Sequence, residues 1–217
     1  MAAKRIVSTR RLVRVGLLVL LLFALPTATA LAHPLGNFTV NRYSALTFTG
    51  GTAQLLYILD LAEIPTYQAM PAIDRDGDGT VSQAEEGAYS AGLGAELAAK
   101  LSLTVNGQRV IWQMEDYDFA FAEGQGGLQT LRLEFRYTGP ISPDGPWNGE
   151  FQDENFPGKL GWQEVVVTAK DDVRIIASSV PGQDISQELR AYPEDLLQSP
   201  PRVNRASFQA ARPTASS

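Results

Sequence analysis

The sequence predicts a mainly β protein, with a β-sandwich-like domain into which a helical EF-hand segment is inserted. Seven or more short runs rich in β-branched and aromatic residues are separated by frequent turn residues, a pattern typical of a sandwich. One Ala-, Glu- and Leu-rich stretch has helical spacing, and a twelve-residue acidic loop directly precedes it. With 217 residues, 44% of them apolar and 19% charged, the chain is long enough for one domain with its own core.

Residues 1–32 are typical of a secretory signal peptide. Basic residues open the chain, an eleven-residue apolar run follows at residues 15–25, and the segment closes with the small residues Ala30 and Ala32 around Leu31. We expect cleavage after Ala32 and a β-rich extracytoplasmic domain over residues 33–208. The apolar run is shorter than the roughly 20 residues of a membrane span. It lengthens if counted on to Ala32, so an uncleaved membrane anchor stays open.

The first predicted element is a hairpin formed by residues 37–48 and 52–61. Both runs are rich in β-branched and aromatic residues, and Gly50 and Gly51 lie between them. The second run is apolar throughout at residues 55–59. We therefore expect it in the middle of a sheet or beneath a cover.

Helical segments follow the hairpin. Pro65 and Pro71 interrupt residues 63–73, so we expect only a short helix there. Residues 82–100 form a longer predicted helix with one buried stripe. Its leucines recur at four-residue spacing: Leu93, Leu97 and Leu101.

The rest of the chain reads as strands, turns and two irregular segments. Further strands are predicted at residues 101–105, 108–114, 117–122, 128–137, 162–169 and 173–177. Asn106-Gly107 is a strong hairpin signal, and the clean alternation over 128–137 predicts a half-buried strand. Residues 140–157, with four prolines, are predicted to be a long loop. The chain is polar after residue 181, and we expect a disordered tail at residues 209–217.

Residues 74–85 carry the strongest chemical signal, because they match the EF-hand calcium loop at every diagnostic position. Gly79 allows the sharp bend around the ion, and Val81 is expected to point into the core. The expected oxygen ligands are Asp74, Asp76, Asp78, Thr80 through its carbonyl, Ser82 and Glu85. A solvated acidic turn without an ion is the alternative. No second loop pairs with this one, which favours a structural role over calcium sensing.

The amino-acid composition limits which other metal sites and which partners the chain can have. The chain has no Cys and one His, which excludes disulfides, thiolate zinc sites and two-histidine metal motifs. Five of the 18 basic residues lie in the predicted signal peptide, whereas all 24 acidic residues follow it. The exported part is therefore strongly acidic, so we expect metal ions or basic surfaces as partners and no nucleic acid.

His33 would be the first residue after cleavage. Its α-amine and imidazole could chelate a divalent ion such as copper or nickel, which prefer nitrogen ligands. Such a pair leaves most coordination positions unfilled, and an ordinary polar terminus is the alternative.

Several segments together resemble the extracytoplasmic N-terminal region of bacterial high-affinity nickel/cobalt transporter-like proteins. They are residues 33–43, 62–66, 74–85, 103–107, 161–162 and 188–197, so the resemblance spans about residues 33–208. It implies a role accessory to nickel or cobalt transport, with His33 as a possible nickel/cobalt contact. A transport domain normally follows this region, and residues 33–217 contain no membrane span. A separately encoded membrane component, or a chain that is a fragment, would account for this.

Two alternatives to that function remain. The chain could be a free-standing secreted calcium-binding protein in adhesion or scaffolding. An enzyme is not expected, because phosphate loops, nucleophile elbows and metalloprotease motifs are missing. Paired carboxylates leave glycoside hydrolysis open: Asp116, Asp118, Asp153 and Glu154. We expect the three tryptophans to serve packing rather than a sugar platform.

Overall fold

The computed structural model describes residues 35–143, 145–197 and 199–212. The predicted signal peptide and His33 lie outside the described residues. Within the described part, no helix combines the length and the apolar character needed to cross a membrane.

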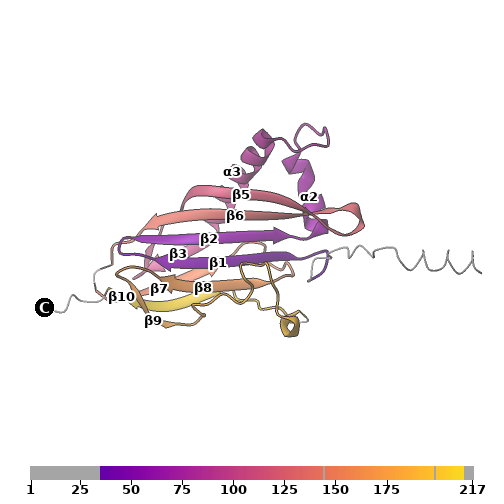
Figure 1. Ribbon diagram of the computed structural model, residues 1–217. Coiled ribbons are helices and arrows are strands. Elements are labelled where there is room, and N and C mark those ends of the chain that lie inside the picture. The colour runs from indigo at the N-terminus through magenta and orange to yellow at the C-terminus, as the bar shows by residue number, and fades with distance from the viewer. Residues whose placement is uncertain (1–34, 144, 198, 213–217) are drawn as a thin grey trace, which may run out of the picture. The chain divides into compact units, whose positions relative to one another are not determined.

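Two five-stranded sheets form the body of the domain (Figure 1). The first sheet has the order β5-β6-β2-β1-β8, and the second has the order β4-β3-β7-β10-β9. The strands of the first sheet are β1 (Val40–Phe48), β2 (Thr52–Leu61), β5 (Gln113–Glu123), β6 (Gln129–Pro140) and β8 (Gln163–Ala169). The strands of the second are β3 (Leu101–Val105), β4 (Gln108–Arg109), β7 (Trp147–Asp153), β9 (Arg174–Ser178) and β10 (Arg205–Ala211). The predicted mainly β class is confirmed.

Neighbouring strands within each sheet pair antiparallel, with the exception of β1 and β8. The predicted first hairpin forms as β1 and β2, with Val40 opposite Leu61 and Phe48 opposite Ala53. β8 pairs with β1 in parallel, with Arg42 opposite Gln163. These pairings place β1 and β2 at the centre of the first sheet, which explains why the middle of β2 is apolar.

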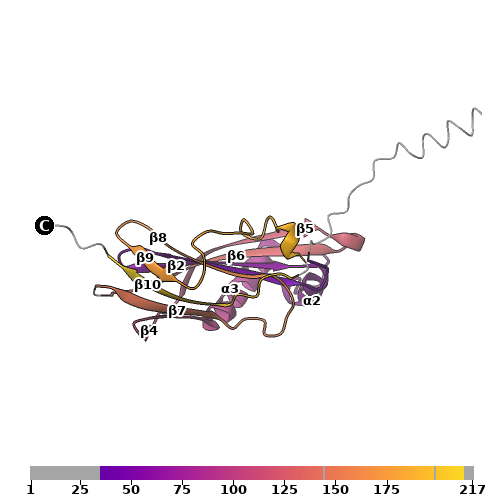
Figure 2. The same ribbon diagram turned by 90° about the horizontal axis from the view of Figure 1, so that it is seen from below.

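The core lies between the sheets. Phe48 of β1 contacts Trp147 of β7 and Phe208 of β10, with ring centroids 4.9 Å apart in both pairs. The predicted alternation of β6 is borne out on its inner face, where Leu131, Leu133, Phe135 and Tyr137 are buried. The two sheets appear as two layers in Figure 2.

Two helices pack on the part of the first sheet formed by β5 and β6. They are α2 (Glu63–Ile73) and α3 (Gln83–Ala99). The Tyr137 hydroxyl of β6 donates to the Gly94 carbonyl of α3 at 2.8 Å. Tyr89 of α3 meets Phe119 of β5 edge-on, with centroids 6.4 Å apart. α3 therefore forms as the leucine spacing predicts, and its buried stripe covers this end of the sheet.

The expectation of only a short helix over residues 63–73 is wrong, because α2 spans all eleven residues. Pro65 is the third helical residue, where the backbone N–H would have no partner inside the helix. Pro71 lies in the last turn and is exposed. Its missing hydrogen bond is therefore on the solvent side, where water can satisfy the carbonyl.

Three further boundaries differ from the prediction. β7 lies inside the segment predicted as a long loop, and Gln209–Ala211, predicted as disordered tail, belong to β10, which pairs with β7 and β9. The strand predicted over residues 108–114 is broken, because β4 belongs to the second sheet and β5 to the first. Residues 110–112 carry the chain between them. Trp112 contributes there by donating its indole N–H to the Leu101 carbonyl at 3.0 Å.

Candidate metal centre

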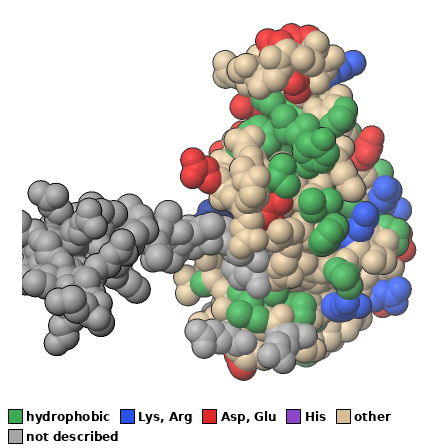
Figure 3. Space-filling view, turned by 90° about the vertical axis from the view of Figure 1, so that its right-hand side faces the viewer, with side chains coloured by type: hydrophobic (Ala, Val, Ile, Leu, Met, Phe, Trp, Pro, Cys, Tyr) green, Lys and Arg blue, Asp and Glu red, His purple; other side chains and the backbone are tan. Residues whose placement is uncertain are grey.

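The predicted calcium loop, residues 74–85, connects α2 to α3 at the tip of the helix pair (Figure 1). Acidic side chains gather at this tip on the face seen in Figure 3. Val81 packs against the main core, as expected, and is partly buried. The loop is thereby fixed at its helices and at Val81, while Asp76 and Asp78 remain exposed.

Three aspartates of the loop lie close together. One carboxylate oxygen each from Asp74, Asp76 and Asp78 can be chosen so that all three lie within 4.8 Å of one another. Asp74 accepts hydrogen bonds from the Gly77 and Gly79 amides, at 2.8 and 3.0 Å. These bonds curl the backbone around the Asp74 carboxylate and hold the three acids on one side of the turn.

Two glycines allow the loop backbone to bend around the Asp74 carboxylate. Gly77 and Gly79 have φ values of +71° and +85°, in the left-handed region that other residues rarely adopt. Two further bends of the loop are held by carboxylates that accept hydrogen bonds from the backbone amide two residues later. Asp76 accepts from the Asp78 amide at 3.2 Å, and Asp78 accepts from the Thr80 amide at 2.7 Å. The sequence singled out Gly79 for the bend, whereas the need at Gly77 emerges only from the backbone.

Glu85 ties the start of α3 to the loop. Its Oε2 accepts hydrogen bonds from the Ser82 amide at 3.0 Å and the Ser82 hydroxyl at 2.8 Å. The Ser82 hydroxyl oxygen in turn accepts from the Glu85 amide at 3.4 Å, which completes a capping box at the helix N-terminus. Its Oε1 accepts from the Arg75 amide at 2.7 Å. Glu85 thus reaches back across the whole loop to the residue that follows Asp74.

These hydrogen bonds also set the charge of Glu85. Bonds from the backbone and side chain of Ser82, then from the Arg75 backbone, lower the pKa of Glu85 to about 2. Glu85 is therefore ionised at neutral pH. Sequence reasoning assigned Glu85 as a ligand but did not find its bond to Arg75, because the contact spans ten residues.

The donor set suits a hard cation. The six residues predicted as ligands, Asp74, Asp76, Asp78, Thr80, Ser82 and Glu85, all belong to this loop and the first turn of α3, and all of them offer oxygen. Calcium takes six to eight oxygen ligands and favours carboxylates. The residues present fit calcium by this chemistry, and they do not fit nickel or copper, which prefer nitrogen. His33, the possible nitrogen ligand, lies outside the described residues.

The other acids singled out in the sequence are divided between the sheets. Asp153 of β7 is buried between the sheets, with its carboxylate 3.6 Å from Nη1 of Arg42. Asp116 and Asp118 of β5 pair with Arg136 on the outer face of the first sheet, at 3.6 and 2.8 Å. The fourth acid considered for glycoside hydrolysis, Glu154, accepts a hydrogen bond from the Gln152 side chain at 2.8 Å. Asp116 and Asp118 therefore share one arginine, and Asp153 pairs with a different one. Trp147 and Trp162 are fully buried in packing.

The comparisons with known proteins give no family for this chain. A scan against models of protein families finds none that matches, and a search of curated proteins finds no significant match. The likeness to nickel/cobalt transporter-like proteins therefore depends on the sequence segments alone.

Proposed function

We propose that this chain is a non-catalytic extracytoplasmic calcium-binding module that is accessory to nickel or cobalt transport. The observation that carries the calcium part is the meeting of three aspartate carboxylates within 4.8 Å, in a loop that also holds an ionised Glu85 carboxylate at its end. Repulsion among such closely spaced negative charges is relieved when a divalent cation binds.

Calcium would act here as a structural clip. The ion joins the end of α2, through Asp74, to the start of α3, through Glu85, and both helices pack on β5 and β6. A single extracytoplasmic loop of this kind binds with a dissociation constant on the order of 10⁻⁴ to 10⁻³ M. Such an affinity suits constant occupation outside the cytoplasm better than signalling.

The transport part of the proposal has different support. It comes from the resemblance of residues 33–43 and 188–197 to the transporter-like proteins, and from the excess of acidic residues after the predicted signal peptide. The chain would present its N-terminus, with His33 as a nickel or cobalt contact, to a separately encoded membrane component. Metal transfer between the two would then need no catalysis by this chain.

The test is calorimetric titration of the protein with calcium and with nickel, beside three variants. Glu85→Gln removes the ligand charge, and Glu86→Gln is the matched control, because Glu86 is the next residue of the same helix turn. We expect Glu85→Gln to abolish calcium binding and Glu86→Gln to retain it. His33→Ala is expected to remove nickel binding and leave calcium binding unchanged.

The outcomes separate the candidates. Equal calcium affinity in the Glu85→Gln variant would refute the ligand assignment. Calcium binding without any nickel binding, together with calcium-dependent self-association, would favour the free-standing scaffold over the transport role.

A further inference from the structure

The segment between β9 and β10 forms a strap, which we define as the described residues 181–197 and 199–203. In Figure 2 it lies along the side of the first sheet that faces away from the second. It covers an outer apolar cluster on that face, consisting of Tyr43, Ile58, Trp162, Val166 and, from the strap itself, Leu189. Tyr192 of the strap adds a ring contact to Trp162, with centroids 5.2 Å apart.

The strap contains a strained turn. Three consecutive residues, Gln187, Glu188 and Leu189, have φ values of +48°, +58° and +63°. Residues other than Gly and Asn rarely adopt this left-handed conformation, and then usually as single residues. None of the three is Gly or Asn, so the backbone here is held in a conformation that it does not prefer.

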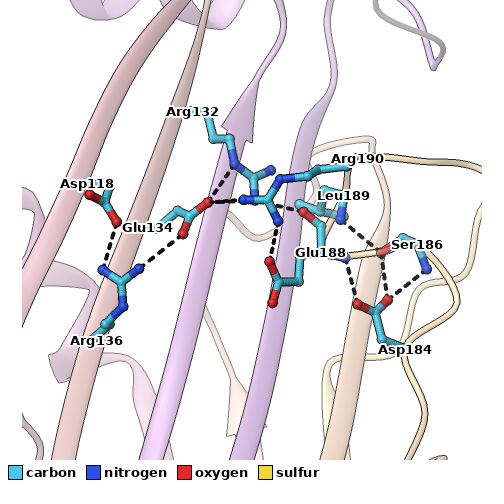
Figure 4. Close-up of polar contacts among 9 residues, drawn as sticks. All are labelled: Asp118, Arg132, Glu134, Arg136, Asp184, Ser186, Glu188, Leu189 and Arg190. Atoms are coloured by element: carbon cyan, nitrogen blue, oxygen red, sulfur yellow. Dashed lines mark hydrogen bonds and ion pairs between the residues drawn. The ribbon is translucent and has the colours of Figure 1, made fainter.

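Hydrogen bonds within the strap hold the turn closed (Figure 4). The Asp184 carboxylate accepts from the Ser186 amide at 2.9 Å and from the Glu188 amide at 2.7 Å. The Ser186 hydroxyl accepts from the Leu189 amide at 3.1 Å. Short polar side chains thus bind the amides of the strained residues directly.

Charged groups then hold the turn to the sheet. Arg132 of β6 donates to the Glu188 carbonyl at 2.8 Å, and Arg190 of the strap pairs with Glu134 of β6 at 3.0 Å (Figure 4). Arg190 also pairs with Glu188. At the β8 edge of the same sheet, Glu164 accepts a hydrogen bond from the Ile185 amide of the strap at 2.8 Å. These contacts fix the turn to β6 and β8.

The strap has little regular structure of its own. Its described residues contain one 3₁₀ turn, Glu194–Leu196, and an isolated bridge from Arg202 to Gln163. Segments of this kind open at a lower free energy than the sheets beneath them. We propose that the strap is a releasable cover: it opens as a unit while both sheets stay folded, favoured by relief of the left-handed turn, and uncovers the apolar face formed by Tyr43, Ile58, Trp162 and Val166.

Neighbouring valines of β8 provide the test. Val166 belongs to the outer cluster under the strap, whereas Val167 belongs to the core between the sheets, and both are almost fully buried. The chain has no cysteine, so Val166→Cys and Val167→Cys each place a single thiol on opposite faces of one strand. We expect the thiol at residue 166 to react with a thiol reagent at least about tenfold faster than the thiol at residue 167 under native conditions.

A second substitution, added to Val166→Cys, changes the strain in the left-handed turn of the strap. The Gln187 side chain is exposed, so Gln187→Gly relieves the left-handed turn without removing a buried contact. It should slow labelling at residue 166 by about five- to tenfold, and Gln187→Val should accelerate it by a similar factor. Gln183→Gly, at an exposed strap residue without a positive φ, is the control and should not slow labelling.

Two results would overturn the proposal. One is equal labelling of the two thiols with the same dependence on denaturant, since that would mean that the strap opens only on global unfolding. The other is a Gln187→Gly variant with unchanged labelling at residue 166. If a cysteine variant does not fold, hydrogen exchange of the Leu189 and Arg190 amides in the unsubstituted chain decides. Exchange as slow as that of the β1 and β2 amides would refute a separate opening.

Discussion

The buried ion pair between the sheets gives a quantitative prediction. Arg42 of β1 and Asp153 of β7 are each about 4% exposed in their side chains, and their charged atoms lie 3.6 Å apart. The Tyr57 hydroxyl donates to the same carboxylate oxygen at 3.4 Å, and the Asn155 amide donates to the other at 2.8 Å. The Arg42 Nε finds no hydrogen-bond partner among the described residues. The pair therefore stabilises Arg42 mainly through charge.

Asp153→Asn keeps the size of the side chain but leaves the Arg42 charge buried without a counterion. Breaking a buried pair in this way costs about 3–5 kcal/mol. For a domain of this size each 1 kcal/mol lowers Tm by roughly 2–4 °C, so we expect a loss of roughly 6–20 °C. The double variant Arg42→Met, Asp153→Asn no longer carries the unpaired Arg42 charge. It should therefore recover most of the lost Tm.

Urea unfolding and thermal melts of the two single variants and the double variant measure the coupling. Additive effects of the two substitutions would refute the reasoning, because paired charges must give a double variant more stable than the sum predicts.

The remaining predictions concern single contacts. Gly149→Ala should destabilise the fold by about 1–3 kcal/mol in urea unfolding, because the new Cβ would lie 2.2 Å from the Phe208 ring; an unchanged midpoint would contradict this packing. Tyr137→Phe should cost about 0.5–1.5 kcal/mol by removing the buried hydrogen bond from the Tyr137 hydroxyl to the Gly94 carbonyl, and equal stability in urea unfolding would contradict this. Ser82→Ala should raise the pKa of Glu85 from about 2 toward its ordinary value of 4.5, as followed by NMR titration. The stability that ionised Glu85 contributes is fully present above its ordinary pKa of 4.5 and is lost as the pH falls through about 2. The variant should lose the Glu85 charge at a higher pH.

Patterns among residues close together in the sequence were enough to predict much of the fold. The hairpin of β1 and β2, the helix α3 and the turn at Asn106-Gly107 were predicted because each depends on residues near one another in the sequence. The loop of the candidate metal centre was found for the same reason. Its three aspartates and two glycines fall within six residues.

Long-range pairing accounts for what was missed. β7 alternates Trp147, Gly149, Phe151 and Asp153 toward the core, but Gly and Asp are not apolar and prolines flank the strand. The glycine is needed because Phe208 of β10 lies over it, and Asp153 is buried because Arg42 of β1 faces it. Neither partner is near in sequence. The outer face of β6 was expected to be exposed for the same reason, whereas the strap buries Glu134 there.

The most direct test of the calcium site is the thermal unfolding of the protein at increasing calcium concentration. At about one hundred times the dissociation constant, binding to the folded form adds about 2.7 kcal/mol. This corresponds to a rise in Tm of roughly 5–11 °C for a domain of this size. We predict that rise for the unsubstituted chain and none for Glu85→Gln. An unchanged Tm of the unsubstituted chain at a calcium concentration of about one hundred times the dissociation constant would contradict the assignment of Asp74, Asp76, Asp78 and Glu85 as calcium ligands.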